Sequence, residues 1–276
     1  MEDIAPKLLD EIRKDFEKKY LKSKKITALK NKLVNGVVSY KDAHDFAIEV
    51  GTMLAGVFGG NLSSDILPDG RLYYNIADRV IRPMLERDFE LITEHSTAIQ
   101  DILNKQSKIG IKAVKPKINT DKVQGIIDIV SGKEKFDDIA YMLAEPIINF
   151  SQAIVDDTVK VNAEFQSESG MSPKIVRTSS GKCCEWCEKI AGVYDYEDAK
   201  KSDVFKRHRS CVCLVEFVTN KKIQNVHSKR KARQEEIEKR IQNSFTKNKE
   251  INRKTKAQAK ALQEKLKKEM SEKKGR

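Results

Sequence analysis

Apolar residues recur at helical spacing over residues 1–168. Clear examples are Ile92, Ile99 and Leu103, and then Ile147, Ile148, Ile154 and Val159. Such spacing puts the apolar side chains on one face of a helix, and turn-forming stretches at 58–70 and 115–120 separate the runs. We therefore predict a helical domain over residues 1–168. The predicted helices are 2–20, 40–58, 72–106, 120–131 and 137–168.

Two of these predicted helices contain a proline, Pro83 in one and Pro146 in the other. Each proline is expected to begin a new helix or to kink the existing one, because it lacks the backbone N–H. No HExxH, phosphate-binding glycine loop or GxSxG motif occurs in this part. We predict no catalytic residue and no cofactor-binding residue here. His44 and His95 stand alone and are interpreted as ordinary surface or core histidines.

The pattern changes over residues 169–219, which we call the β module. After the helix-breaking "SGMSP", the segments "KIVRTS", "GVYDY" and "CLVEFV" have strand composition. A unit of about 50 residues buries too little apolar surface to be stable alone, and it needs a staple or a neighbour. The predicted fold class is therefore mainly α, with a small β module between the helical domain and a C-terminal tail.

The tail, residues 220–276, is rich in lysine. A thin apolar stripe repeats every four residues, at Ile237, Ile241 and Phe245, and again at Leu262, Leu266 and Met270. One interpretation is a solvated extension, partly helical or disordered. The other is an arm that lies along nucleic acid or docks on an acidic surface.

Charge is distributed unevenly along the 276 residues. The formal net charge is +12, and residues 221–276 hold 20 Lys and Arg against 7 Asp and Glu, a net of +13. Residues 1–220 are therefore close to neutral, at −1. Lysines release counterions from the DNA backbone whatever its sequence. We predict that double-stranded DNA binds non-specifically through residues 221–276.

Membrane and export signals are not expected. The N-terminal stretch is charged and has no apolar segment of the signal-peptide kind, and glycines interrupt the longest apolar run. We predict no membrane partner and synthesis in a reducing cytoplasm. There, clustered cysteines favour metal binding over disulfides.

All five cysteines lie within residues 183–213. Two chelating turns carry them, a first knuckle with Cys184-x₂-Cys187 and a second with His208-x₂-Cys211-x-Cys213. Four nitrogen and sulfur ligands satisfy one Zn²⁺ ion and leave no open position, so we predict one structural zinc per chain. The preferred ligands are Cys184, Cys187, His208 and Cys211, with Cys213 replacing His208 as the alternative. Cys183 falls outside the spacing and is interpreted as a bystander.

Three further side chains flank the predicted metal site. Trp186, the only tryptophan, lies inside the first knuckle and is expected to pack beneath the site or against the helices. Arg177 and Arg207 flank the two knuckles, and each is expected to pair with a carboxylate or to cap a turn. A zinc deaminase is excluded because no HxE precedes the cysteines and no PCxxC follows.

Residues 162–217 resemble the Mu F-like minor head proteins of tailed phages, also called head morphogenesis proteins. The shared motif is a CxxC knuckle, a Gly-x-Tyr/Phe hairpin and a His-x-x-Cys-x-Cys knuckle that leads into a strand. These positions are Cys184, Cys187, Gly192, Tyr194, His208, Cys211 and Cys213. The chain has Arg209 where many members have proline after the histidine.

The resemblance implies a non-enzymatic virion component. Such a protein is associated with the portal protein and with capsid or scaffold components inside the head, and contributes to head assembly and to DNA packaging or ejection. A second hypothesis is a zinc-containing nucleic-acid-binding protein of a mobile element. A third, a zinc nuclease of the HNH kind, requires an Asn or second His beside the metal, and no Asn lies between the knuckles.

Overall fold

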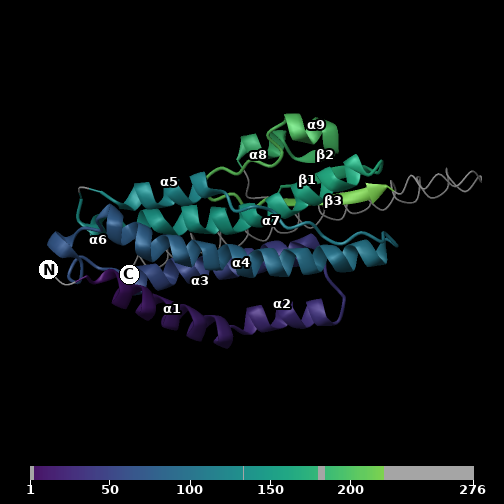
Figure 1. The fold of residues 1–276 in the computed structure, drawn as a ribbon. Helices are drawn as coiled ribbons and strands as arrows, with labels where there is room; N and C mark the ends of the chain where they lie inside the picture. Colours follow the sequence, from purple (N-terminus) through teal and green to yellow (C-terminus); the bar gives the residue numbers. More distant parts are fainter. Residues whose placement is uncertain (1–2, 133, 180–183, 221–276) are drawn as a thin grey trace, which may run out of the picture.

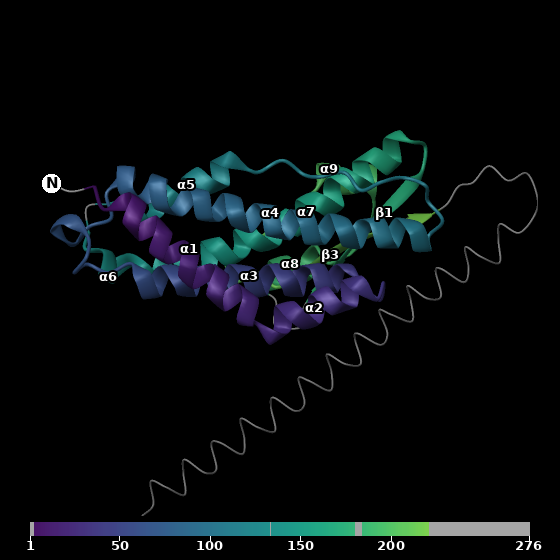
Figure 2. The ribbon, with the colours of Figure 1, turned by 60° about the horizontal axis from the view of Figure 1, so that its bottom comes forward.

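The computed structural model describes residues 3–132, 134–179 and 184–220 as an elongated helical bundle with a small sheet on one side (Figure 1). Helices α3, α4 and α7 run along the long axis. Figures 1 and 2 show α1 and α2 outside α3. The helices are α1 Ala5–Lys22, α2 Lys24–Val34, α3 Tyr40–Asn61, α4 Tyr74–Gln106, α5 Thr120–Val130, α6 Phe136–Ile139, α7 Ala144–Glu168, α8 Glu185–Lys189 and α9 Tyr196–Lys201, with 3-10 turns η1 Pro68–Gly70 and η2 Ala140–Leu143.

The mainly helical prediction for residues 1–168 is confirmed, except for one missed helix. The predicted helices at 40–58, 72–106 and 120–131 match α3, α4 and α5 within a few residues. Helix α2 was not predicted. It buries only Ile26 and Leu29, a stripe too thin to stand out from the many lysines of residues 18–32. Ser23 ends α1 and caps α2, where its hydroxyl accepts a hydrogen bond from the Ile26 N–H.

The two prolines behave differently. The predicted helix at 137–168 is divided into α6, η2 and α7, and Pro146 lies in the first turn of α7. Backbone N–H groups there have no intrahelical partner, so proline costs little. Pro83 lies inside α4, which continues across it, so no new helix begins there. The fully buried Val80, Ile81 and Leu85 around it offset the roughly 3 kcal/mol cost of an internal proline.

Helices α3, α4 and α7 meet closely at Gly51. A Cβ added to this residue would lie 2.4 Å from Ser151 Oγ and 3.2 Å from the Ile148 Cα. The Ser151 hydroxyl in turn donates a 2.7 Å hydrogen bond to Asp88 Oδ2 on α4. Only glycine lets α3 approach α7 this closely, and the approach buries the polar Ser151–Asp88 pair.

The three predicted strands are present as one antiparallel sheet of order β2-β1-β3. They are β1 Ser172–Thr178, β2 Gly192–Asp195 and β3 Leu214–Asn220. Helix α7 ends at Glu168, and Gly170, at a φ of +79°, turns the chain into β1. The apolar side chains Ile175, Val215 and Phe217 belong to the same core cluster as the helices. Figure 1 shows the sheet and α9 beside α7.

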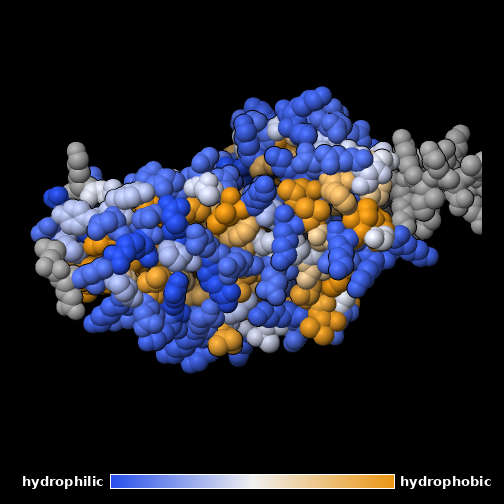
Figure 3. All heavy atoms as spheres, viewed as in Figure 1, coloured by the Kyte–Doolittle hydropathy of each residue, from blue (hydrophilic) through white to orange (hydrophobic). Residues whose placement is uncertain are grey.

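Polar and charged residues cover much of the face shown in Figure 3, with apolar residues in smaller patches. In the described part of the chain, no helix combines the length and the apolar character needed to cross a bilayer. The predicted basic tail beyond residue 220 and Cys183 lie outside the described residues.

Candidate metal centre

Strand pairing brings the two knuckles together. In the antiparallel β1–β3 pair, Thr178 at the end of β1 lies opposite Leu214 at the start of β3. The first knuckle begins shortly after Thr178, and the second ends directly before Leu214. The sheet register therefore places both knuckles at the same end of the sheet, although a long stretch of sequence separates them.

Side-chain sulfur and nitrogen atoms from both knuckles converge there. His208 Nε2 lies 3.3 Å from Cys184 Sγ and 2.8 Å from Cys187 Sγ. Cys187 Sγ lies 3.7 Å from Cys211 Sγ. His208 Nδ1 lies 2.5 Å from the Arg209 carbonyl oxygen, and an N–H at Nδ1 leaves Nε2 as the nitrogen that faces the sulfurs.

These side chains form two groups that could each hold a metal ion. Cys184, Cys187 and His208 make the first, Cys187, Cys211 and Cys213 make the second, and within each group the ligand atoms lie within 4.8 Å of one another. Each of the five sequence-predicted ligand residues thus lies in one of these groups, Cys187 is common to both, and the preferred set of Cys184, Cys187, His208 and Cys211 takes members from both groups. No disulfide joins the four described cysteines.

Part of the cluster is buried, and part of it is accessible to solvent. Cys187, Cys211 and Cys213 are buried, whereas Cys184 is exposed and His208 is half-buried. Trp186 lies edge-on to the His208 ring at 5.6 Å between centroids and packs against the three buried cysteines. The expectation that Trp186 packs at the site is confirmed. One side of the site is therefore closed by protein, and Cys184 lies on its exposed side.

Ionisation is uneven among the buried thiols. A hydrogen bond from Cys213 is the largest cause that lowers the pKa of Cys211, to about 4, and the nearby Arg207 and Arg177 lower it further. Burial raises the pKa of Cys187 to about 11. Cys211 is therefore the sulfur of this pair that ionises first.

Arg207 forms a buried polar network that ties the β module to the helices. Its guanidinium pairs with Asp156 on α7, with a 2.9 Å bond from Nη2 to Oδ1, and its Nη1 donates to Gln152 Oε1 at 2.8 Å. Arg207 Nη2 also donates to His44 Nδ1 at 3.3 Å, and His44 Nε2 lies 3.2 Å from the Val215 carbonyl oxygen. The expected carboxylate partner of Arg207 is thus Asp156.

His44 belongs to this network and not to the metal cluster. Burial lowers its pKa to about 4, so the ring is neutral and donates through Nε2 to the β3 backbone. His95 is also buried, stacks on Phe46 at 3.9 Å and has its pKa lowered to about 4 by burial. Both histidines are core residues, one of the two alternatives that the sequence left open. The structural role of His44 was not foreseen, because nothing local in the sequence links it to Arg207.

Arg177 caps a turn and faces the cysteines. Nη1 donates to the Val204 and Lys206 carbonyl oxygens at 2.5 and 2.9 Å. Nη2 points at sulfur, 3.4 Å from Cys211 Sγ and 3.8 Å from Cys187 Sγ. This contact with the predicted ligands was not foreseen from the spacing of the residues.

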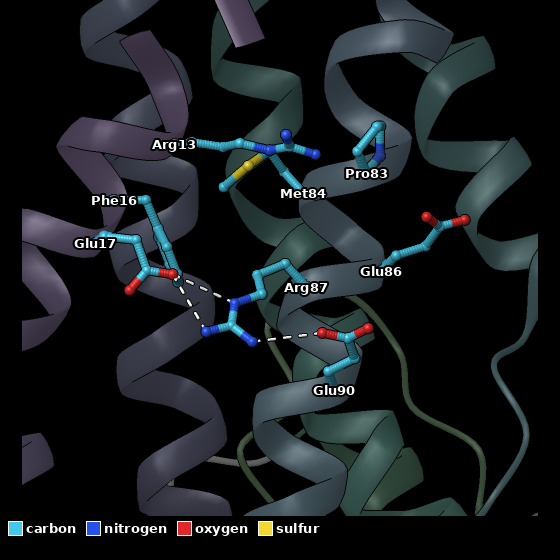
Figure 4. Close-up of a pocket in the computed structure, with 8 residues that line it drawn as sticks. All are labelled: Arg13, Phe16, Glu17, Pro83, Met84, Glu86, Arg87 and Glu90. Atoms are coloured by element: carbon cyan, nitrogen blue, oxygen red, sulfur yellow. Dashed lines mark hydrogen bonds and ion pairs between the residues drawn. The ribbon is translucent and has the colours of Figure 1, made fainter. Parts of the chain in front are cut away.

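A surface hollow between α1 and α4 contains no cysteine or histidine. Arg87 crosses it and pairs with Glu17 and Glu90 (Figure 4). Its lining residues are Arg13, Phe16, Glu17, Pro83, Met84, Glu86, Arg87 and Glu90. None of them comes from the β module, so this hollow is separate from the candidate metal centre.

Comparison with known proteins adds no relative. No family model, no curated protein and no solved structure matches this chain.

Proposed function

We propose that the cluster holds one structural zinc ion, and that the protein is a non-enzymatic minor head protein of a tailed phage. The observation that supports the zinc is the meeting of the two knuckles. Thiolates at about 2.3 Å from a tetrahedral Zn²⁺ lie about 3.8 Å apart, and the Cys187–Cys211 separation is 3.7 Å. The His208–Cys187 separation is shorter, as in a thiol–imidazole hydrogen bond.

A zinc ion with four protein ligands would staple the β module. The ion would join the turn after β1 to the turn before β3, and it would supply no open position for catalysis. Elemental analysis of the purified full chain tests this proposal. About one zinc per chain is expected. A folded protein that contains no zinc, and whose fold does not change when a chelator is added, would contradict this proposal.

The head-protein proposal is supported by the motif of residues 162–217, whose two knuckles are the residues that cluster. In this proposal the protein lies inside the capsid at the portal vertex, where it contacts the portal protein and capsid or scaffold components. Quantitative mass spectrometry of nuclease-treated particles from an induced culture of the source bacterium tests it. We expect a few copies per portal ring, and absence from intact particles would contradict a virion role.

We further propose that residues 221–276 bind packaged DNA without sequence preference. The supporting observation is the net charge of +13 on this segment against −1 on the rest. The slope of log affinity against log salt becomes shallower by about 0.9 for each phosphate group that the protein no longer neutralises. Replacement of Lys254, Lys256 and Lys260 by Gln should therefore flatten this slope by up to about 2.7.

A matched control removes the same charge from the helical bundle. Lys18, Lys22 and Lys24 lie on α1 and α2 and reach solvent, and their replacement by Gln should leave the slope nearly unchanged. The second hypothesis, a zinc-containing nucleic-acid-binding protein, predicts strong preference for one duplex sequence. Sequence-independent affinity on random duplexes supports the head-protein proposal, and a preference that survives removal of residues 221–276 supports the alternative.

A further inference from the structure

Arg177 is a fully buried guanidinium without a carboxylate partner among the described residues. Its exposed fraction is 0%, and no Asp or Glu oxygen in the described part of the chain lies within 4.0 Å of it. A guanidinium stays charged in proteins. A buried charge is strongly destabilising unless an opposite charge and hydrogen bonds compensate it.

Arg207 provides the comparison within the same module. Its side chain is also buried, and it meets the carboxylate of Asp156 directly. Arg177 instead uses Nη1 for two carbonyl oxygens and Nη2 for two sulfurs. The groups beside Arg177 that carry negative charge once a metal ion binds them are therefore the sulfurs of Cys187 and Cys211.

Charge counting then separates the two possible ligand sets. Zn²⁺ with three thiolates and a neutral imidazole carries a net charge of −1, which the single positive charge of Arg177 cancels. Zn²⁺ with four thiolates carries −2 and would leave one buried negative charge beside Arg177.

We infer that Arg177 is the positioning residue that balances the charge of the metal-bound thiolates, and that it thereby selects Cys184, Cys187, His208 and Cys211 as ligands, with Cys213 outside the ligand set. This inference rests on the proposed metal centre and adds the ligand set to it. Arg177 also lies 5.6 Å from the Trp186 ring, which shields the guanidinium from water on that side.

Zinc affinity of full-length variants, measured by competition with a chromophoric chelator, tests the role of Arg177. Arg177→Gln keeps a hydrogen-bond donor and loses the charge, so a loss of about 10- to 100-fold is expected, the usual effect of removing a partner of a metal ligand. Arg177→Lys keeps the charge and should lose clearly less. Arg87→Gln is the matched control, because Arg87 lies in the helical bundle and pairs with Glu17 and Glu90, and this variant should bind zinc like the unchanged chain.

Co²⁺ substitution tests the ligand set independently of folding stability. The intensity of the sulfur-to-cobalt charge-transfer band counts thiolate ligands, so Cys213→Ser should leave the band unchanged and Cys211→Ser should remove about a third of it, one of three thiolates. Circular dichroism of each loaded variant shows whether it folds.

Each negative result has a different meaning. A chain that binds neither zinc nor cobalt contradicts the metal centre itself. Normal metal content with equal affinity in Arg177→Gln contradicts only the role of Arg177. A Cys213→Ser spectrum that loses one thiolate, or a greater loss of affinity in Arg177→Lys than in Arg177→Gln, overturns the charge-balance argument.

Discussion

The helical bundle and the β module each bury an ionisable side chain, but the charge is removed in one and compensated by neighbours in the other. In the bundle, Asp88 is fully buried and its Oδ1 atom has no hydrogen-bond partner among the described residues. Burial raises the pKa of Asp88 to about 7, so the carboxyl can take up a proton and lose its charge. The guanidinium of Arg177 in the β module cannot lose its charge in this way, so it needs an anion beside it. A buried carboxyl can therefore become neutral by taking up a proton, whereas a buried guanidinium stays charged and must be compensated by its neighbours.

The same contrast holds for what stabilises each region. The bundle has a continuous apolar core that includes Phe16, Phe46 and Phe58. The module contributes Ile175, Val215 and Phe217 to that core from one face of its sheet. Its other buried cluster consists of three cysteines with Trp186 against them. The module is thus attached to the bundle by apolar packing, and its outer part depends on the sulfur cluster.

The largest effect is expected from Cys187→Ser, because Cys187 belongs to both candidate ligand groups. Zinc content should fall from about one per chain to near zero, and amides in β1 and β3 should exchange with solvent much faster than those in α1 and α4. Elemental analysis and hydrogen exchange by mass spectrometry measure the two effects. Equal acceleration in both regions would show that the module and the bundle unfold as one unit.

Arg207→Met should give the next largest effect by breaking the connection between the regions. It leaves Asp156 buried without its ion pair, which typically costs about 3–5 kcal/mol. Urea unfolding of this variant, of Asp156→Asn and of the double variant measures the coupling. The double variant should be less destabilised than the sum of the single ones, and simple additivity would show that the pair contributes little.

Asp88→Asn should change the pH dependence of the bundle alone. Because the folded-state pKa, about 7, exceeds the ordinary value of 3.8, the folded protein retains a proton that the unfolded chain has lost between about pH 4 and pH 7. Stability therefore falls as pH rises through this window, by up to about 4 kcal/mol.

The Asp88→Asn variant lacks this loss and keeps an acceptor for Ser151. It should equal the unchanged chain near pH 4 and be more stable at pH 8, as measured by urea unfolding at each pH. His44 and His95 titrate in both proteins, so their effects cancel in the difference. A pH-independent difference would contradict the assignment to Asp88.

Gly51→Ala should have the smallest effect of the four, a destabilisation of about 1–3 kcal/mol through overpacking. The methyl group of alanine would lie too close to Ser151 Oγ. It would therefore displace this hydroxyl and weaken its hydrogen bond to Asp88. Gly56→Ala on the same helix is the control. It meets no atom within 4 Å and should stabilise by about 0.5–1 kcal/mol. Thermal unfolding of both variants checks the opposite signs.

The fold was largely predictable where one residue pattern dominates. The apolar repeats of Ile92 and Ile99 on α4 predicted a long helix, and the strand composition around Ile175 predicted β1. Helix α2 was missed because its stability comes from packing of Ile26 and Leu29 on the bundle and from the Ser23 cap. Such a helix is stabilised by its neighbours more than by its own sequence.

The sequence by itself determined the helical and strand periods, the concentration of positive charge in residues 221–276, and the identity of the metal-binding candidates through the spacing of Cys184, Cys187, His208 and Cys211. Those are local properties, set by side-chain chemistry within a few residues. Only the tertiary structure decided that Arg177 faces two sulfurs, that Arg207 meets Asp156 and that His44 reaches β3. These contacts join residues far apart in the chain, and they depend on sheet register and helix packing, which no local pattern specifies.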